Sequence, residues 1–409
     1  MAVCLSALFR WLSATVYWLA TTALLPWFLL RLWRKSRKEP RYFERPWQRL
    51  GLIPRRIDRP IWLHGVSVGE VVMLKAITDK ITDPIAISTT TAGGLETAER
   101  QWPSQAVNWW PFDHPLAALL YVWRLRPRML LIAETELWPA VLWACRCFSV
   151  PVYVVNGRIS DHSFPGYQKW SRLLQPWVQS IEQVFARTAE DAARFDVLGV
   201  GRRPAVALGN LKYDREFIAD HTQLQNVAAW GGEYLLLAST HPSEEMALLG
   251  QLLPKFAQTI VIAPRHVSRA AELLAEIAAR YPALTVARGS ARDVLPVCDI
   301  LIADQFGEML AWFAKASCVI MGGSFIPHGG QNPVEAAAMG SPVLIGPHGF
   351  NFKDDIRVLT DAGALDVVTF DQVAHQVQTR WGQRVNISDQ LARGAVDRLM
   401  NQIFNEMEI

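Results

Sequence analysis

Residues 322–335 have the sequence Gly-Gly-Ser-Phe-Ile-Pro-His-Gly-Gly-Gln-Asn-Pro-Val-Glu, and this stretch decides the fold that we expect. A short β-branched apolar run ends at residue 321, directly before it, and alanines at residues 336–338 continue at helical propensity until Gly340. Two glycine pairs let a backbone approach a ligand without a clash from a Cβ atom. The stretch therefore predicts a strand, a glycine loop and a helix in succession.

Asn332 and Pro333 mark the expected start of that helix, because Asn is favoured at the N-cap and Pro at the first helical position. Free amides and the positive end of the helix dipole then face the glycine loop, which favours a phosphate. Glu335, in the first turn, is placed to accept hydrogen bonds from ribose hydroxyls. The stretch indicates a nucleotide monophosphate site, although a capped helix that binds nothing fits it equally well when it is taken alone.

Apolar, strand-like runs alternate with helix-length segments from Pro60 onward. The first series comprises residues 61–63, 85–88, 129–133, 152–155, 184–186 and 206–208, and the second comprises residues 234–238, 259–263, 300–303, 318–321 and 342–345. Apolar strands separated by helices indicate parallel sheets covered on both faces. The sequence therefore predicts an α/β protein with two doubly wound domains, with ligands bound in a cleft at the carboxyl ends of the strands.

The same pattern predicts the domain boundaries. We expect a membrane anchor with its basic flank at residues 1–40, a first Rossmann-like domain at residues 41–215 and a second at residues 233–409. Residues 216–232 are polar, contain no strong strand and end in a glycine pair, which favours a linker. By analogy with such folds, the last helix is expected to cross back to the first domain.

The amino-terminal segment predicts a membrane anchor. Trp11 to Leu30 is a run of uncharged residues of about the ~20 needed to span a bilayer, and a cluster of Arg and Lys follows it directly. This order places the carboxyl side in the cytoplasm. A buried core helix is the alternative. Residues 41–59 mix arginines with aromatic side chains, which indicates either a surface lying on anionic lipid or a solvated linker.

Composition excludes several classes of protein. The chain has 409 residues, a net charge of +3 and five scattered cysteines, which is not the pattern of a disulfide framework. The basic cluster adjoins the apolar segment rather than forming a stripe on the globular part, so we expect no nucleic-acid partner. No Gly-x-Gly-x-x-Gly follows a strand, which disfavours a dinucleotide-binding dehydrogenase.

Polar side chains follow the predicted strands, and each has two interpretations. Glu70 closes a Ser-x-x-Glu segment, so it is a candidate base or simply the acid of a capping box. Glu134 is a candidate catalytic acid or a first-turn acid favoured by a helix dipole. Lys212 is a candidate catalytic cation or a solvated lysine. Arg265, after a strand and a proline, is a candidate phosphate ligand or half of a surface ion pair.

Taken together, these segments resemble the bacterial 3-deoxy-D-manno-octulosonic acid (Kdo) transferases, membrane-anchored enzymes that transfer Kdo from CMP-Kdo to a lipid A precursor, lipid IVA. The resemblance covers nearly the whole chain and rests on residues 64–70, 134–139, 210–214, 264–266, 322–335 and 346–352. It implies a GT-B fold, inversion of the anomeric centre, and no requirement for a metal or another cofactor. It also implies a location at the cytoplasmic face of the inner membrane, in lipopolysaccharide biosynthesis.

The resemblance also assigns roles residue by residue. Glu70 takes the position of the catalytic base, and Glu134 and Lys212 take positions of transition-state stabilisation. The CMP-binding positions are Pro264, Arg265, Phe306, Gly307, Glu308, Asn332, Pro333, Val334 and Glu335. The chain departs from the family at Gln331, where histidine is expected.

Two other functions stay open at this point. One is a related GT-B enzyme that uses a UDP-sugar donor, and the other is a membrane-anchored nucleotide-binding protein without catalysis. The sequence does not decide how many Kdo residues are transferred, which acyl chains are preferred, what the oligomeric state is, or whether Lys212 contacts the donor carboxylate or an acceptor phosphate.

Overall fold

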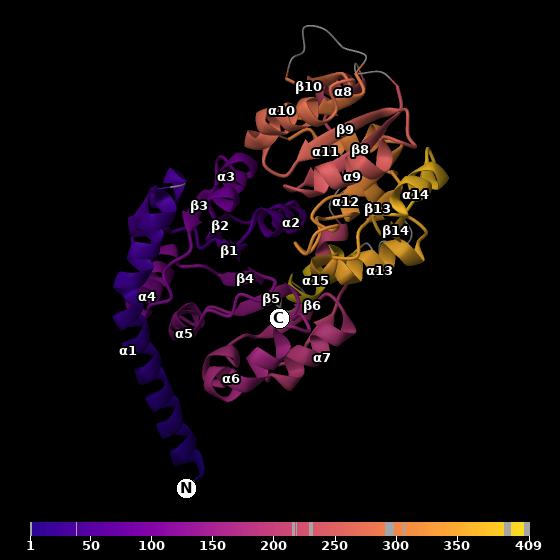
Figure 1. Ribbon diagram of the computed structural model, residues 1–409. Coiled ribbons are helices and arrows are strands. Elements are labelled where there is room, and N and C mark those ends of the chain that lie inside the picture. The colour runs from indigo at the N-terminus through magenta and orange to yellow at the C-terminus, as the bar shows by residue number, and fades with distance from the viewer. Residues whose placement is uncertain are drawn as a thin grey trace. The chain divides into compact units, whose positions relative to one another are not determined.

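A computed structural model gives the fold of the chain (Figure 1). It describes residues 2–37, 39–214, 217, 219–228, 232–290, 298–305, 307–387 and 394–404, with residues 2–14 described by their backbone alone. The chain forms two compact units, and each is described by itself. Unit 1 comprises Met1–Arg215 and Ala392–Ile409, and unit 2 comprises Glu216–Leu391.

Unit 1 is built on a parallel sheet in the order β3-β2-β1-β4-β5-β6-β7. Its strands are β1 (Ile61–His64), β2 (Ile85–Thr89), β3 (Ala106–Trp109), β4 (Met129–Ala133), β5 (Val152–Gly157), β6 (Gln183–Ala186) and β7 (Val206–Ala207). Its helices are α1 (Ala2–Ser36), α2 (Val68–Thr78), α3 (Ala92–Gln101), α4 (Pro115–Leu125), α5 (Pro139–Cys147), α6 (Phe164–Val178), α7 (Ala189–Val197) and α15 (Ala395–Phe404), with short 3-10 turns η1 (Pro40–Phe43), η2 (Pro46–Leu50) and η3 (Leu211–Tyr213).

Helices cover both faces of this sheet because side chains alternate along each buried strand. Ile61 and Leu63 of β1 pack with side chains of α2, α3 and α15 on one face. Trp62, between them, packs with side chains of α4, α5 and α7 on the other. The C-terminal helix α15 therefore completes the core of unit 1, and its first turn is held by Asp214, whose carboxylate accepts from Gly394 N at 2.6 Å and also from Val396 N.

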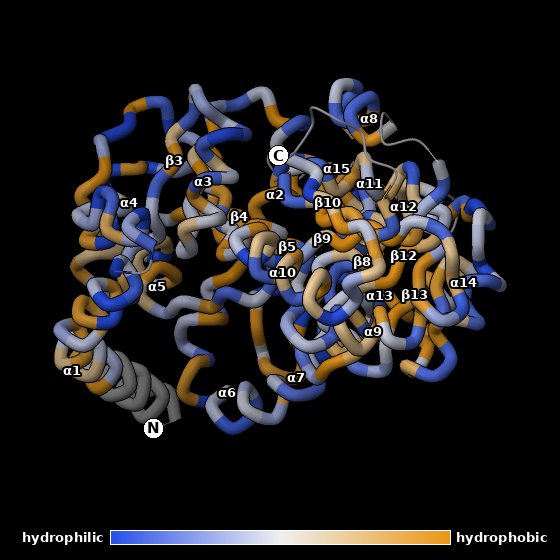
Figure 2. Tube along the Cα trace, turned by 45° about the horizontal axis from the view of Figure 1, so that its top comes forward, coloured by the Kyte–Doolittle hydropathy of each residue, from blue (hydrophilic) through white to orange (hydrophobic). Residues whose placement is uncertain are grey.

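Unit 2 repeats the architecture, with a parallel sheet in the order β10-β11-β9-β8-β12-β13-β14. Its strands are β8 (Tyr234–Thr240), β9 (Thr259–Pro264), β10 (Val286–Arg288), β11 (Ile300–Ile302), β12 (Cys318–Met321), β13 (Val343–Ile345) and β14 (Leu365–Val367). Its helices are α8 (His221–Ala228), α9 (Glu244–Leu252), α10 (Ala270–Arg280), α11 (Met309–Lys315), α12 (Val334–Ala338), α13 (Lys353–Asp361) and α14 (Val373–Arg380), with 3-10 turns η4 (Val267–Arg269) and η5 (Phe350–Phe352). The central strands are mostly hydrophobic, as Figure 2 shows.

Helix α1 packs against the rest of unit 1 through aromatic side chains. Tyr17 packs on Trp177 with ring centroids 5.3 Å apart, and its hydroxyl donates to Asp113. Trp18 packs edge-on against Trp143. Within the described residues, the part of α1 from Thr15 to Ser36 is long and apolar enough to cross a membrane, and little of it is buried.

The α/β class with two parallel sheets is confirmed, and the structure corrects several details. Three edge strands, β3, β10 and β14, were not predicted. The segment expected to be a linker, residues 216–232, contains helix α8, which packs on α11. Helix α12 begins at Val334, one residue later than expected, because Pro333 holds the N-cap position while the Asn332 side chain accepts from Val334 N at 3.1 Å.

Candidate active site

Helix α2 of unit 1 holds Glu70 in a fixed position. Ser67 is the N-cap, and its Oγ accepts from Glu70 N at 3.4 Å. The Glu70 carboxylate accepts from Val66 N at 2.8 Å and from the Ser67 hydroxyl at 2.7 Å, and the residue is 8% exposed. Half of the capping box is present, because Ser67 Oγ accepts from Glu70 N. The Glu70 carboxylate binds Val66 N and the Ser67 hydroxyl rather than the Ser67 backbone N–H of a capping box, and these two contacts orient a buried carboxylate.

The loop that precedes α2 is held to the end of β2. The hydroxyls of Thr89 and Thr91 donate to Val66 O at 3.0 and 2.7 Å. Gly94 lies so close that an added Cβ would come within 2.3 Å of Thr89 Oγ1. A residue larger than glycine at position 94 would therefore displace the loop.

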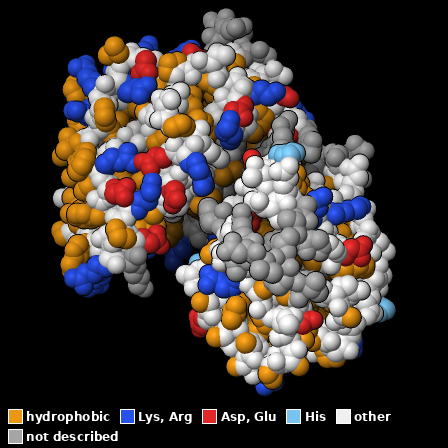
Figure 3. Space-filling view, turned by 90° about the horizontal axis from the view of Figure 1, so that it is seen from above, with side chains coloured by type: hydrophobic (Ala, Val, Ile, Leu, Met, Phe, Trp, Pro, Cys, Tyr) orange, Lys and Arg blue, Asp and Glu red, His pale blue; other side chains and the backbone are white. Residues whose placement is uncertain are grey.

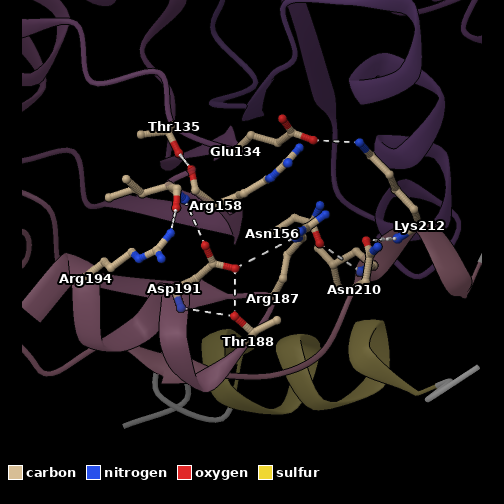
Figure 4. Close-up of polar contacts among 12 residues, drawn as sticks. Glu134, Thr135, Asn156, Arg158, Arg187, Thr188, Asp191, Arg194, Asn210 and Lys212 are labelled. Atoms are coloured by element: carbon tan, nitrogen blue, oxygen red, sulfur yellow. Dashed lines mark hydrogen bonds and ion pairs between the residues drawn. The ribbon is translucent and has the colours of Figure 1, made fainter. Parts of the chain in front are cut away.

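Glu134 and Lys212 form an ion pair in the same unit (Figure 4). Lys212 Nζ lies 2.6 Å from Glu134 Oε1, although the two residues come from different elements. Glu134 follows β4 with a left-handed backbone, φ 59°, and donates its N–H to Val155 O at 2.9 Å. Lys212 lies in η3, where the Asn210 side chain accepts from Lys212 N at 3.1 Å. A left-handed glutamate is uncommon and is worth a functional explanation.

Glu70, Glu134 and Lys212 form a cluster of charged groups in which the pKa values of the two acids shift in opposite directions. Burial raises the pKa of Glu70, and the charge of Glu134 raises it further, while Lys212 acts against this rise. Burial also acts to raise the pKa of Glu134, but Lys212, Arg187 and Arg158 outweigh it, so the pKa of Glu134 falls below its usual range. The pKa values of the two acids are thus shifted in opposite directions, with Glu134 held in its charged form by the neighbouring cations.

Glu136 is a third acid of the cluster that was not assigned a role from the sequence. Burial, with the charges of Glu70 and Glu134, raises the pKa of Glu136 to about 7. Its carboxylate accepts from Trp138 Nε1 at 2.8 Å. The alternation Glu-x-Glu directly after a buried strand was the available signal, but only the folded positions show that Glu136 interacts with Glu70.

In unit 2 the glycine loop after β12 is held by Glu244. The Glu244 carboxylate accepts from Gly323 N at 2.7 Å and from His241 N at 2.7 Å, and the residue is fully buried. Gly322 is in close contact with β8, since an added Cβ would lie 2.5 Å from Ser239 O. Gly330 N in turn donates to Gly323 O at 2.8 Å, which closes the loop.

Basic side chains gather beside this loop. The rings of His241 and His328 lie 4.0 Å apart, and His266 meets His241 edge-on at 6.4 Å. Gln331, the departure from the family pattern, places its Nε2 3.1 Å from His241 Nε2. Burial, together with the neighbouring His328, His266, Arg265 and Arg269, lowers the pKa of His241 to about 4. A bound anion would be attracted to the Arg265 side chain near this ring.

Most of the residues predicted to bind the donor lie after adjacent strands of unit 2. Pro264 ends β9, and Arg265 follows it with an exposed side chain that no carboxylate pairs with in the part of the chain that the structure describes. Gly307 and Glu308 follow β11, and Asn332 to Glu335 follow β12. Because β11, β9, β8 and β12 are neighbours in one parallel sheet, these segments share an edge of it. Phe306 lies outside the described residues.

The described residues contain no group of three or more His, Cys, Asp or Glu side chains arranged to hold a metal ion.

Comparison with known proteins identifies the family. Residues 44–215 match the family model described as 3-deoxy-D-manno-octulosonic-acid transferase (kdotransferase). The chain is 33% identical over 377 residues to the 3-deoxy-D-manno-octulosonic acid transferase of Bordetella pertussis, covering 85% of this chain and 86% of that protein. It is 26% identical over 350 residues to the protein of the same name from Haemophilus influenzae, covering 81% and 82%.

Among solved structures, the chain is similar to the UDP-GlcNAc 2-epimerase from Neisseria meningitidis, with a TM-score of 0.56 at 12% identity, covering 85% of this chain and all of that one. This likeness shows the fold alone, a GT-B-like chain with two parallel-sheet α/β domains. The relative from Bordetella pertussis is similar in sequence over most of the length of both chains. The chain belongs to the 3-deoxy-D-manno-octulosonic acid transferase family.

Proposed function

We propose that the chain is an inverting glycosyltransferase that moves Kdo from CMP-Kdo to a lipid A precursor, lipid IVA, at the cytoplasmic face of the inner membrane. One observation carries the proposal. In a chain of this family, a buried and doubly hydrogen-bonded carboxylate, Glu70, has its pKa raised and lies in the electrostatic field of the Glu134–Lys212 ion pair.

Glu70 acts as the general base. It takes the proton from an acceptor hydroxyl, the hydroxyl oxygen bonds to the anomeric carbon of Kdo, and the bond from that carbon to the CMP phosphate oxygen breaks. A buried carboxylate whose pKa is raised is suited to this step, which contributes roughly 10²- to 10⁴-fold to the rate. Val66 N and Ser67 Oγ orient the carboxylate without adding a positive charge.

Lys212 and Glu134 stabilise the transition state electrostatically. Glu134 fixes the ammonium group at 2.6 Å, so that Lys212 presents its charge to an anionic group of a substrate. The carboxylate of Kdo and a phosphate of the acceptor both have the required charge.

Unit 2 binds the donor. Arg265, exposed at the end of β9, has a planar fork that suits a phosphate, and its side chain has no described carboxylate partner. The histidines around His241 and the backbone amides of the glycine loop add positive potential at the same edge of the sheet. Glu335 binds the ribose hydroxyls, and the backbone of residues 306–308 contacts the nucleotide.

Calorimetry with CMP and with UDP, followed by mass spectrometry of the lipid product, tests the proposal. We expect CMP to bind more tightly than UDP and lipid IVA to gain the mass of one or more Kdo residues when CMP-Kdo is supplied. Tighter binding of UDP would favour an enzyme with a UDP-sugar donor. Intact CMP binding without any mass increment would favour a binding protein without catalysis.

A further inference from the structure

A cavity of about 430 Å³ lies between α1 and the rest of unit 1. Leu24, Leu25 and Phe28 of α1 form one wall, and Trp110, Phe112 and Trp138 lie among the residues that form the other. Its volume falls within the ~300–1,000 Å³ that is usual for small-molecule sites. The proposed function uses none of these side chains.

Two buried donor atoms at this cavity, Arg49 Nε and Trp110 Nε1, have no hydrogen-bond partner among the residues that the structure describes. Arg49 is 6% exposed, and its Nη2 makes a long contact of 3.5 Å to Thr90 O. Its guanidinium lies 3.9 Å from the centroid of the Trp109 ring. Trp110 is 2% exposed. Buried donors without acceptors are costly and uncommon, so a ligand with acceptor oxygens is the natural partner of both.

The charges around the cavity favour an anion. Arg31, Lys35 and Arg49 line it, and Asp113 is the acid among the lining residues. Asp113 is already engaged, because Tyr17 donates its hydroxyl to the carboxylate and Ala140 N donates to Oδ1 at 2.8 Å. Three cations therefore remain against one acid that is satisfied within the protein.

The apolar wall and the exposed outer face of α1 make this cavity accessible from a lipid phase. Leu24, Trp27 and Phe28 are exposed on α1, and hydrophobic side chains gather along the edge of unit 1 at the left of Figure 3, the side on which α1 runs. An acyl chain that enters from a bilayer would contact the apolar walls of the cavity. The three cations, two of which belong to the basic end of α1, would then be available to an anionic group of the same lipid.

The end of β2 connects the cavity to the loop that precedes α2. Thr90 lines the cavity, and the hydroxyls of its neighbours Thr89 and Thr91 hold Val66 O, while Val66 N holds the Glu70 carboxylate. Trp138 also lines the cavity, and it donates to Glu136. Two residues that line the cavity are thus connected, through sequence neighbours or a hydrogen bond, to Glu70 and Glu136 of the candidate site.

We propose that this cavity is a subsite for the lipid acceptor, in which one acyl chain lies against α1 and an anionic phosphate of the same lipid binds Arg49, with Trp110 Nε1 donating to a further oxygen of that lipid. The inference rests on the proposed function and deepens it, since it names Arg49 as a residue that binds the acceptor and α1 as one wall of its site.

The first test fills the cavity from the α1 side. Leu25→Trp places an indole in the cavity, and Leu29→Trp is the matched control, because Leu29 lies one turn later on α1, is exposed and is not among the lining residues. In detergent micelles we expect Leu25→Trp to raise the acceptor KM by roughly tenfold, as overfilling a packed site does. The donor KM should be unchanged in both variants. Equal acceptor KM values for the two variants would overturn the inference.

The second test removes the charge. Arg49→Met should raise the KM of a phosphorylated acceptor by about tenfold to a hundredfold, the loss of one charge-assisted hydrogen bond, and should leave the KM of the phosphate-free acceptor nearly unchanged. Arg45→Met is the control, because Arg45 pairs with Glu99 and does not line the cavity. An equal loss with both acceptors would assign Arg49 a structural role and would overturn its role as a phosphate ligand.

Photocrosslinking separates failure of the inference from failure of the function. The probe is the phosphorylated acceptor with a diazirine in an acyl chain, applied to the full chain. Crosslinks to residues 17–35 or 110–114 support the subsite, and they should be competed by unlabelled acceptor. Crosslinks elsewhere in an enzyme that transfers Kdo, or equal competition by a bulk phospholipid, would overturn it. Crosslinks at these residues without any Kdo transfer would overturn the proposed function and support a lipid site alone.

Discussion

Gly322→Ala tests how closely the glycine loop after β12 packs on β8 in unit 2. A Cβ at position 322 would lie 2.5 Å from Ser239 O, 2.6 Å from Thr240 Cα and 2.8 Å from Glu244 Oε1, all shorter than real Cβ contacts. Two of these atoms belong to backbone, and Glu244 is held in place by Gly323 N and His241 N, so the neighbours have little freedom to move.

The expected cost follows from this geometry. Overpacking of this kind costs about 1–3 kcal/mol, and at ~2–4 °C per kcal/mol for a unit of this size the melting temperature of unit 2 should fall by roughly 2–12 °C. Gly166→Ala is the control, because Gly166 lies in helix α6 with no atom within 4 Å of an added Cβ, and alanine favours the helix.

Differential scanning calorimetry of the two variants, with and without CMP, measures the effect. We expect Gly322→Ala to melt earlier and to lose most of the stabilisation that CMP gives, and Gly166→Ala to melt at or above the wild-type temperature. Melting of Gly322→Ala at the wild-type temperature with full stabilisation by CMP would refute the close contact between the loop and β8.

Three further predictions concern activity. Burial and Glu134 raise the pKa of Glu70, so the base is protonated at low pH and the rate should rise with pH through a value above the pKa of a free glutamate. Lys212 lowers this pKa, so Lys212→Met should move the acid limb of the residual pH–rate profile to higher pH. An acid limb that does not move would show that Lys212 does not influence the pKa of Glu70. Transfer should persist in excess chelator, and a loss that magnesium restores would end the prediction of metal independence. A chain starting near Arg41 should keep CMP binding but act poorly on vesicle-bound acceptor, and equal activity on vesicles would contradict the role of α1 as an anchor that concentrates the enzyme at the membrane.

The buried strands were predictable from the sequence, and the edge strands were not. Strands such as β4 and β12 are continuous apolar runs, and sequence periodicity finds them. Strands β3, β10 and β14 lie at sheet edges, and they carry Asn108, Arg288 and Asp366, so no apolar run marks them. Helix α8 was taken as a linker because its residues are mostly polar, and its packing on α11 is a tertiary effect.

Prediction of the candidate site from the sequence was limited for a different reason. The sequence places polar side chains after strands, but it does not show that Lys212 reaches Glu134, because that contact depends on the strand order and on the left-handed backbone of Glu134. The two interpretations of Glu70 also could not be separated, since the contact with Ser67 that caps α2 also orients a base.

The basic segment near residues 41–59 was interpreted as a lipid-facing surface or a linker. In the structure, Gln48 and Arg49 of this segment are buried, while Phe43 and Trp47 are exposed. Which arginine of such a segment becomes buried depends on its neighbours in space, here the Trp109 ring, and no local pattern encodes this. The cavity beside Arg49 is invisible in the sequence for the same reason.

The role of Glu70 as the base is the central claim. The most direct measurement is mass spectrometry of lipid IVA after incubation with CMP-Kdo and the wild type, Glu70→Ala or Ser67→Ala, with CMP binding measured for each. Ser67→Ala removes the cap of α2 and costs about 1 kcal/mol of stability but keeps the carboxylate. We expect Kdo mass increments with the wild type and with Ser67→Ala, and none with a Glu70→Ala protein that still binds CMP. Unimpaired transfer by Glu70→Ala would contradict the role of Glu70 as the base and would leave Glu70 as a capping residue.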